Sequence, residues 1–424
     1  MGKRLLVLAS GRWDNTVAVV DLAAALDPAN DGSDRAVVAR PRATPDVPGR
    51  GGAPPRPAGG QPVNVVAPPG AGRFYVVNHS GSVPPEAAEA FQHGHPGAVA
   101  VLDLRRAMDP ANSGTARAIE AILPLGADGP VGAAVTPDGR HLLVASAEAA
   151  GLEDGGREVV ALDLATGGVA RRVGLATSGG GGPPSTRPAP DEGYGRYPNP
   201  NGIAVSPLGR GLIVTANGGT DDVSVLGLPA ALAGEAGAER ARVPVQSGGF
   251  GVTVSPDGRL AAVAARESMR TGRAGNTISL IDLARAADGG GRDAEAARAR
   301  VGTDDPEEPT RPFVAAFTPD GAHLVATCFL SDTVSLLDVG AALAGRPAEV
   351  ARLRLATPGG GPGRPRGVAI TPDGAFAAVT GGPKAGPGSS VLFLLDLLSF
   401  RLAATATGIG NESYFLDMAE TPAA

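Results

Sequence analysis

Short apolar runs alternate with clusters of glycine, proline and polar residues along the whole chain. One phrase recurs, in which an apolar run, a Pro-Asp-Gly turn and a second apolar run follow each other. Proline fixes φ at the second turn position, and Asp and Gly suit the next positions, so each copy predicts a β-hairpin. The copies lie at residues 133–146, 203–216, 252–265, 315–328 and 368–381, with a looser copy at 65–78.

A further apolar strand follows each hairpin, and most copies end in Asp-Leu. Many of these strands are followed by a fourth strand, as at 169–175 and 350–356. Blades of four antiparallel strands, repeated at intervals of roughly 55–80 residues, are typical of a β-propeller, in which ring closure removes open strand edges. The seven third strands lie at residues 17–22, 99–104, 159–164, 223–228, 278–283, 334–339 and 392–397.

The sequence therefore predicts an all-β, seven-bladed β-propeller of four-stranded antiparallel blades. The strand at 17–22 is preceded by only one strand, at 4–10, so its blade lacks an innermost strand. We expect the C-terminal segment 413–419 to supply it and to close the ring. The predicted single domain covers 1–424, with blades at 1–60 plus 411–419, 61–129, 130–200, 201–248, 249–311, 312–364 and 365–410.

The repeat resembles a known family. The segments YVVN (75–78) and IVTAN (213–217), the Ser/Thr-Pro-Asp-Gly turns and the VSLLD-type strands are similar to those of the YVTN-repeat, or YncE-like, propellers. That group overlaps in appearance with the lactonase-like propellers, and the resemblance covers essentially the whole chain. It departs from the pattern at Leu208 and Gly227, which stand where the turn and the strand end usually carry Asp. The resemblance implies the fold rather than one activity, because propellers host unrelated functions.

Composition narrows the classes of partner and location. The chain has a formal charge of −6 without a run of Lys or Arg, so a nucleic-acid partner is not expected. Its one cysteine excludes an intrachain disulfide, and the longest apolar runs are too short to span a membrane. The apolar run near Met1 is too short for a signal-peptide core. We expect a monomer, cytoplasmic as written, and periplasmic or secreted if a leader is missing, since YncE-like proteins are commonly exported.

The long loops are predicted to gather on one face, at the blade entrances and between second and third strands. Binding sites usually occupy such loops, although Gly/Pro-rich loops are also tolerated as plain insertions. The first residues of the inner strands should surround the mouth of the central channel on that face. We place Asn64, Val131, Asn201, Phe250, Phe313, Arg366 and Tyr414 near that ring. We expect a small-molecule ligand or a protein partner there, and the predicted ligand-binding residues are Asn64, Asn201, Phe250, Phe313, Arg366 and Tyr414, with Arg266 from an adjacent loop.

Three of the five histidines, His79, His93 and His95, fall in one loop and the strand end before it. His93 and His95 point to the same side of an extended chain, so the three imidazoles could hold zinc or copper with an open position. A solvated loop without a metal explains the same pattern. The acidic run 304–308 could hold calcium, although it matches no defined calcium loop. Cys328 is expected to be a buried structural thiol.

Two functions remain open from the sequence. The first is a binding or scaffold propeller that uses the loop-rich face, which fits degenerate repeats without a complete catalytic motif. The second is a lactonase-like hydrolase, in which a metal or the acids of the rim would activate water while Arg366 holds a substrate carboxylate. The shared fold is the main support for the second function.

Overall fold

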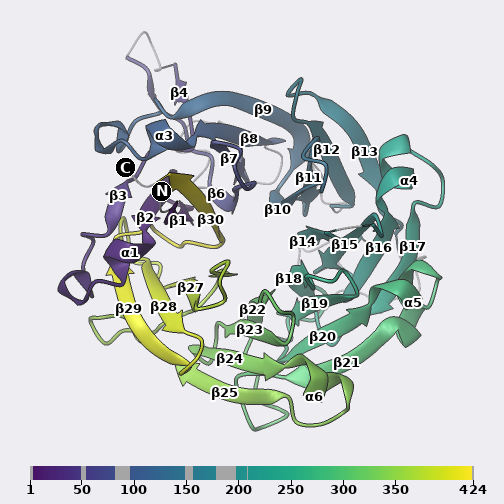
Figure 1. Cartoon of the computed structure of the whole chain (residues 1–424). Coiled ribbons are helices and arrows are strands. Elements are labelled where there is room, and N and C mark those ends of the chain that lie inside the picture. Colours follow the sequence, from purple (N-terminus) through teal and green to yellow (C-terminus); the bar gives the residue numbers. More distant parts are fainter. Residues whose placement is uncertain are drawn as a thin grey trace. The chain divides into compact units, whose positions relative to one another are not determined.

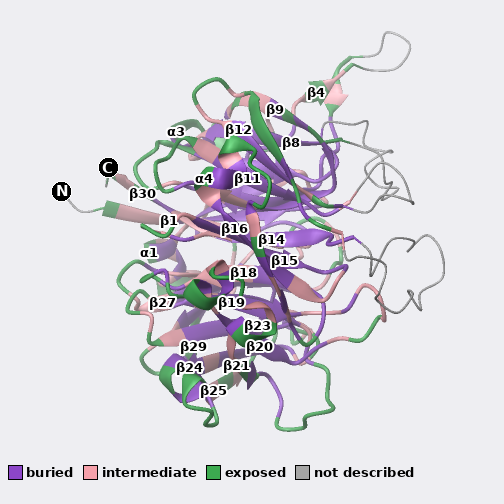
Figure 2. Ribbon diagram, turned by 90° about the vertical axis from the view of Figure 1, so that its right-hand side faces the viewer, coloured by how far each residue is buried: buried purple, intermediate pink, exposed green. Residues whose placement is uncertain are grey.

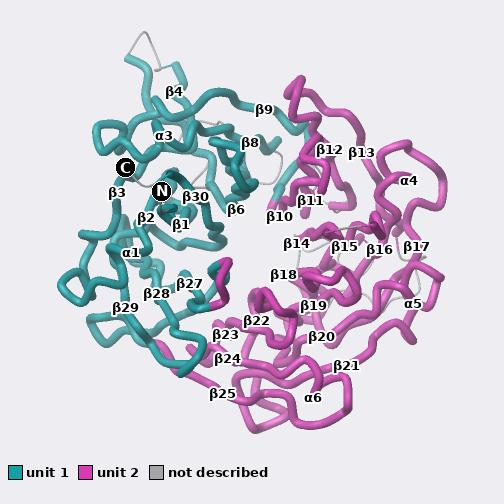
Figure 3. The backbone as a smooth tube through the Cα atoms, in the orientation of Figure 1, with its two compact units in different colours: residues 1–130, 356–371, 375–424 teal, residues 131–355, 372–374 magenta. Residues whose placement is uncertain are grey.

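The computed structural model describes residues 3–48, 54–81, 96–148, 156–177, 197–207 and 209–422. Seven four-stranded antiparallel sheets hold most of its strands, so the predicted all-β, seven-bladed propeller is confirmed (Figure 1). The chain divides into two compact units, each described by itself below (Figure 3). Residues 1–130, 356–371 and 375–424 form the first unit, and residues 131–355 and 372–374 form the second.

The first unit contains three blades, with strand orders β3-β2-β1-β30, β6-β7-β8-β9 and β26-β27-β28-β29. A two-stranded ribbon, β4 (Asp46–Val47) and β5 (Arg56–Pro57), lies between the first two blades in sequence. The blade strands are β1 (Lys3–Gly11), β2 (Thr16–Asp21), β3 (Val37–Ala39), β6 (Pro62–Val66), β7 (Arg73–Asn78), β8 (Pro96–Asp103), β9 (Ile119–Asp128), β26 (Val368–Ile370), β27 (Phe376–Gly381), β28 (Val391–Asp396), β29 (Arg401–Thr407) and β30 (Leu416–Pro422).

The C-terminal strand β30 pairs with the N-terminal strand β1, as predicted. The two run antiparallel from the pair Ala9–Leu416 to the pair Lys3–Pro422. The strand begins three residues later than the expected segment 413–419. Ser413 lies in a loop, because its backbone N–H donates to Ser390 Oγ at 3.0 Å and its hydroxyl donates to the Ile409 carbonyl at 3.3 Å.

The second unit contains four blades whose strands follow each other in simple sequence order. Its strands are β10 (Pro130–Val135), β11 (His141–Ser146), β12 (Glu158–Asp163), β13 (Val169–Gly174), β14 (Pro200–Val205), β15 (Leu212–Asn217), β16 (Asp222–Gly227), β17 (Glu239–Pro244), β18 (Gly249–Val254), β19 (Leu260–Ala265), β20 (Thr277–Asp282), β21 (Glu295–Arg300), β22 (Pro312–Phe317), β23 (His323–Cys328), β24 (Thr333–Asp338) and β25 (Glu349–Arg354).

The strand-ending Asp caps the helical turn that follows β2, β8, β20 and β24, whereas Asp163 and Asp396 hold turns. Asp103 Oδ1 accepts the backbone N–H of Arg106 at 2.7 Å, and Asp338 Oδ1 accepts that of Ala341 at 2.8 Å. Such caps satisfy backbone donors that a first helical turn leaves unpaired. Gly227 has no side chain to do so, and Pro229, the second residue of that helix, has no backbone N–H that would need a partner. The helical turns are α1 (Leu22–Ala25), η1 (Pro28–Asn30), α3 (Leu104–Ala107), η3 (Pro110–Asn112), α4 (Leu228–Ala233), α5 (Leu283–Ala287), η4 (Gly291–Ala294) and α6 (Val339–Leu343).

Both faces of a blade are buried at its middle strands, which explains why these strands are apolar at nearly every position, whereas outermost strands such as β13 and β25 are partly exposed and carry charged residues. On β1, Leu6 and Leu8 pack into a core shared with β7 and β8, whereas Val7 and Ala9 pack into one shared with β27 and β28. Side chains alternate between the two faces of a strand, so a sheet packed on both sides needs apolar residues throughout. Figure 2 shows the buried residues concentrated on the strands and the exposed residues on the connecting turns.

Candidate functional site

The residues predicted at the channel mouth lie next to each other within each unit. In the second unit, a Cβ added at Gly132, Gly202 or Gly251 would lie 2.7, 2.3 or 2.7 Å from the backbone oxygen of Asn201, Phe250 or Phe313, respectively. In the first unit, a Cβ at Gly367 would lie 2.5 Å from the Tyr414 oxygen. Each glycine directly follows a predicted mouth residue. The inner strands therefore approach closely there and set the mouth residues side by side.

The blade entrances hold non-glycine residues in a strained backbone conformation. Left-handed φ is uncommon for such residues, and it clusters at functional sites when the surrounding structure enforces it. Sequence reasoning missed these positions, although most are marked by a proline that follows directly. The entrance residues are Gln61 (φ 53°), Asn199 (φ 48°), Arg311 (φ 54°), Arg364 (φ 42°) and Glu412 (φ 56°).

In the first unit, Arg12 is the centre of a polar cluster that the sequence did not predict. It follows β1 and is 7% exposed. Its Nη1 donates to the Tyr414 hydroxyl at 3.0 Å, and its Nε donates to Gln61 Oε1 at 3.0 Å. Its guanidinium carbon lies 5.0 Å from the centroid of the Tyr414 ring, and its Nη1 lies 3.7 Å from Glu412 Oε2. The predicted mouth residue Tyr414 thus belongs to a cation, carboxylate and phenol cluster.

Trp13 extends this cluster toward solvent. Its indole N–H donates to the Glu412 carboxylate, which fixes both side chains. The Lys384 ammonium lies 3.8 Å from the centroid of a Trp13 ring, and the Arg12 guanidinium carbon lies 5.0 Å from it. Burial raises the pKa of neighbouring Asp14, whose Oδ2 accepts the Gly388 N–H at 3.4 Å. The rim of this unit therefore carries cations, an indole face and carboxylates.

Arg366 and Asn64 are both buried, at 3% and 8% exposure. Arg366 Nη1 donates to the Gly382 carbonyl at 3.0 Å, so its head group is held against the loop that follows β27. His79 is also buried, and its backbone N–H donates to the Gln61 carbonyl at 3.1 Å. The joint action of these three side chains on a ligand stays a prediction.

In the second unit, the structure brings together the three predicted residues Phe250, Phe313 and Arg266. The two phenyl rings have centroids 4.4 Å apart. The Arg266 guanidinium carbon lies 4.6 Å from the Phe250 centroid and 5.1 Å from that of Phe313. Asn201 lies one inner strand away, where its Nδ2 donates to the Asn199 carbonyl at 3.3 Å, and Val131 is buried.

Only some of the residues predicted to bind a metal lie within the described part of the chain. His93 and His95 lie outside the described residues, so the proposed three-histidine site stays a prediction. Within the described part of the chain, no group of three or more His, Cys, Asp or Glu side chains is arranged to hold a metal ion. In the acidic run, Glu308 accepts from the Thr303 hydroxyl, and Asp304 pairs with Arg352 at 3.0 Å. These carboxylates are used in local ion pairs and turns.

Cys328 is a buried thiol, as expected. Burial raises its pKa to about 12, so almost none of it is thiolate at neutral pH and it is a poor nucleophile. No helix within the described residues is long and apolar enough to cross a membrane.

Asp417 on β30 makes folding stability depend on pH. Its Oδ2 accepts the Ala67 N–H at 2.8 Å, and burial raises its pKa from 3.8 to about 6. Between these values the folded state keeps a proton that the unfolded state has released, so this carboxyl lowers stability as pH rises. The free energy of unfolding of Asp417→Ala, measured relative to that of the wild type, should rise by about 1–2 kcal/mol between about pH 4 and about pH 7.5. This rise is smaller than the full pKa shift would give, because the side chain keeps some contact with solvent. Urea unfolding at both pH values measures it, and an equal difference at both would contradict it.

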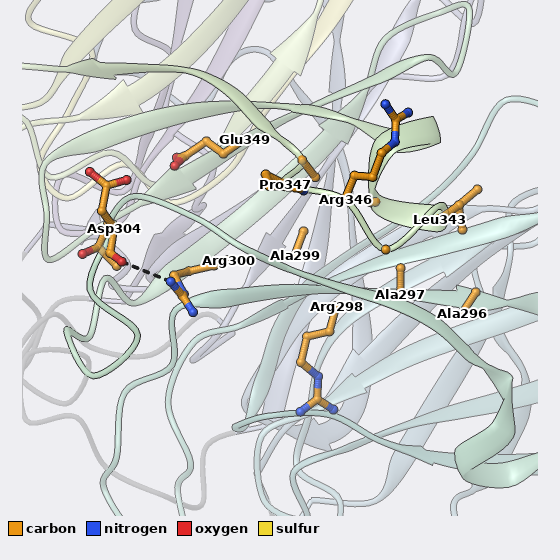
Figure 4. A pocket seen from close by; sticks show the side chains of 14 residues that line it. Ala296, Ala297, Arg298, Ala299, Arg300, Asp304, Leu343, Arg346, Pro347 and Glu349 are labelled. Atoms are coloured by element: carbon orange, nitrogen blue, oxygen red, sulfur yellow. Dashed lines mark hydrogen bonds between the residues drawn. The ribbon is translucent and has the colours of Figure 1, made fainter.

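A groove of about 630 Å³ lies between β21 and the segment from α6 to β25 (Figure 4). Arg300 Nη1 donates to the Asp304 carbonyl across one end of it at 3.1 Å. A similar groove of about 580 Å³ lies between β13 and the segment from α4 to β17. Because the hollow recurs where an outermost strand meets the helix of the next blade, we attribute it to blade packing. The blade entrances therefore stay the candidate site.

Comparison with known proteins gives the fold but not a family. Neither a protein-family model nor any curated protein sequence matches the chain. Solved structures do match. The structural neighbours include lactonase-like propellers. The resemblance to YVTN-repeat propellers stays a prediction.

Two of these neighbours match over nearly the whole chain. The periplasmic gluconolactonase PpgL from Pseudomonas aeruginosa has 18% identity and a TM-score of 0.64, covering 98% of this chain and 99% of that one. A Bacteroides fragilis protein named as a candidate 6-phosphogluconolactonase has 13% identity and a TM-score of 0.60 over 98% of both chains. Hydrazine synthase from Kuenenia stuttgartiensis has 18% identity and a TM-score of 0.54 over 79% of this chain and 76% of that one. These identities show the fold alone, which hosts different activities.

Proposed function

We propose that the protein is a lactonase-like hydrolase that opens the ring of a small sugar lactone at the blade entrances of the first unit. The cluster of Arg12, Glu412 and Tyr414 carries the proposal, because it joins a guanidinium, a carboxylate and a phenol hydroxyl in one place. Whole-chain likeness to two propellers whose names refer to gluconolactone hydrolysis supports it.

Each side chain has a role in ester hydrolysis. Arg12 stabilises the negative charge that develops on the carbonyl oxygen when water attacks. Glu412 accepts a proton from that water, and the Tyr414 hydroxyl donates a proton to the ring oxygen as the carbon–oxygen bond breaks. The product is a hydroxy acid. Asn64 and Arg366 would position the substrate, with Arg366 directed to an anionic group.

A divalent metal would supply a further electrophile. We keep the site predicted at His79, His93 and His95, with zinc or copper as candidates, as part of this proposal. Elemental analysis of the untagged protein, purified after growth in metal-replete medium, tests it. A metal-free protein that still hydrolyses lactones would remove the metal from the mechanism.

The activity test uses glucono-δ-lactone and its 6-phospho derivative in a continuous pH-indicator assay. We expect turnover above the uncatalysed rate, and Arg12→Met should lower kcat/KM by about a hundredfold or more because it removes the oxyanion donor. Glu412→Gln should lower it by about a hundredfold through loss of the base. The matched control is Arg4→Met, which removes the same charge at the other end of β1 and should leave kcat/KM unchanged.

Absence of turnover with both lactones would reject the hydrolase. The protein would then be a binding propeller, presenting the entrance face to a small ligand or a protein partner. The cluster of Phe250, Phe313 and Arg266 in the second unit favours this second function, because a guanidinium held over two aromatic rings near a blade entrance is a feature that ligands bind.

A further inference from the structure

The second unit contains an open strand edge that borders a groove. β21 is the outermost strand of its sheet, so within the described residues its outer edge pairs with no other strand. Residues 296–300 of this strand line the groove of about 630 Å³ that separates β21 from the segment between α6 and β25 (Figure 4). We propose that this groove is a docking site, in which an extended, acidic segment of a partner protein adds a further strand to β21.

The backbone of β21 directs hydrogen-bonding groups toward this groove. Val301, directly after the strand, donates its N–H to the carbonyl of Asn276, directly before β20, at 2.9 Å. The backbone groups of successive residues in a strand point to opposite edges, so those of Arg300 and Arg298 point away from β20. The outer edge therefore presents two N–H donors and two carbonyl acceptors, which a segment in extended conformation matches.

Small residues leave this groove open, whereas the similar groove beside β13 is bridged. Arg171 on β13 and Ala297 on β21 occupy the same register position, each opposite the residue that lies two before the strand-ending Asp. Arg171 Nε donates to the Leu232 carbonyl of α4 at 3.2 Å, so this arginine links its strand to the helix of the next blade. Ala297 has only a methyl group at that position, which leaves room beside β21 for the side chain of a ligand.

The two faces of β21 differ in chemistry. Ala297 and Ala299 pack toward the core that this blade shares with the next, and Leu343 of α6, which is 45% exposed, lines the groove from the other side. Arg298 and Arg300 lie on the opposite face, because side chains alternate along a strand. A strand added beside β21 would set every second side chain against the alanines and Leu343, and the others beside the two arginines. This arrangement selects a segment in which apolar and acidic residues alternate.

The charges favour an acidic partner over a second copy of this chain. The two carboxylates of the lining, Asp304 and Glu349, both pair with Arg352. Arg300 donates to a backbone carbonyl, and the exposed Arg346 forms no ion pair within the described residues. Pairing of β21 with β21 of a second copy would bring the arginines of the two strands together, and like charges across a strand pair are destabilising. Carboxylates in the same positions are attracted instead.

The test measures binding of a fluorescein-labelled peptide to the full chain by fluorescence anisotropy. The peptide has about seven residues in which glutamate and valine alternate, with blocked ends, to match the length of the strand edge. We expect saturable binding. Ala297→Arg should weaken it by about tenfold or more, because the new side chain fills the groove as Arg171 bridges the other one. Arg300→Glu should weaken it by about tenfold through charge repulsion. The matched control is Arg354→Glu, at the same register position on β25, which should leave the affinity unchanged.

Two further peptides separate the contribution of the backbone from that of the charges. N-methylation of every backbone amide removes the donors that strand pairing needs and should abolish binding. Lysine in place of glutamate should weaken binding by about tenfold or more. The proposal is overturned if the glutamate and valine peptide does not bind saturably, if either control peptide binds as tightly, or if a folded Ala297→Arg or Arg300→Glu variant keeps the affinity of the wild type. Thermal unfolding of each variant establishes that it is folded.

Discussion

Removal of residues 416–424 is expected to abolish the cooperative unfolding transition of the protein. β30 contributes a continuous ladder of backbone pairs to β1 between Leu416 and Pro422. Leu416 and Ala419 also belong to the cores on the two faces of that blade. The loss should exceed about 5 kcal/mol, since buried side chains and a whole strand ladder are removed together. Thermal unfolding by circular dichroism, with light scattering, measures the outcome.

Truncation after Pro422 is the matched control, because it leaves every β1–β30 pair in place. It should melt like the full chain. The longer truncation leaves β1 as an open edge, so we also expect it to aggregate. A truncated chain that keeps the melting temperature of the wild type would show that β30 contributes little to the fold.

Gly202→Ala is expected to destabilise the protein by about 2–4 kcal/mol, because the new methyl group overpacks two inner strands. The added Cβ would lie 2.3 Å from the Phe250 carbonyl oxygen and 3.1 Å from the Val252 nitrogen, and both are backbone atoms that cannot rotate away. Chemical denaturation measures the stability change.

Gly174→Ala is the control for this substitution. Gly174 ends β13, and a Cβ there would meet nothing within 4 Å. Its unfolding free energy should change by less than about 0.5 kcal/mol. Similar losses for both variants would show that the close approach of the inner strands is not what limits the size of residue 202.

The fold could be predicted from the sequence because the apolar pattern, the turn residues and the helix caps all indicate the same blades. The apolar strands, the Pro-Asp-Gly hairpins and the strand-ending Asp all repeat with the blades, and Asp103 shows why the Asp recurs, as a helix cap. The start of β30 was placed three residues too early. Apolar character extends through Tyr414 and Phe415, but the hydrogen bonds of Ser413 hold that segment in a loop, and no local pattern signals them.

The candidate site was predicted less completely. Phe250, Phe313 and Tyr414 were found because the repeat register gives the start of each inner strand. The sequence pattern does not single out Arg12, because the loop after β1 is short and only long loops signal function in the sequence. Glu412 lies just before β30 and belongs to no marked motif. The strained entrance residues could have been found by aligning the X-Pro pairs before each inner strand, a comparison that needs only the repeat register.

The pairing of β1 with β30 also means that one blade is assembled from both ends of the chain, by hydrogen bonds and side-chain packing alone. The position of the two chain ends within this blade is therefore not required by the strand pairing. A circular permutant that joins the two termini through a short linker would keep every strand pair and convert the seam into a covalent connection. A donor and acceptor dye at the two ends would, in turn, report the opening of this blade before the rest of the molecule unfolds.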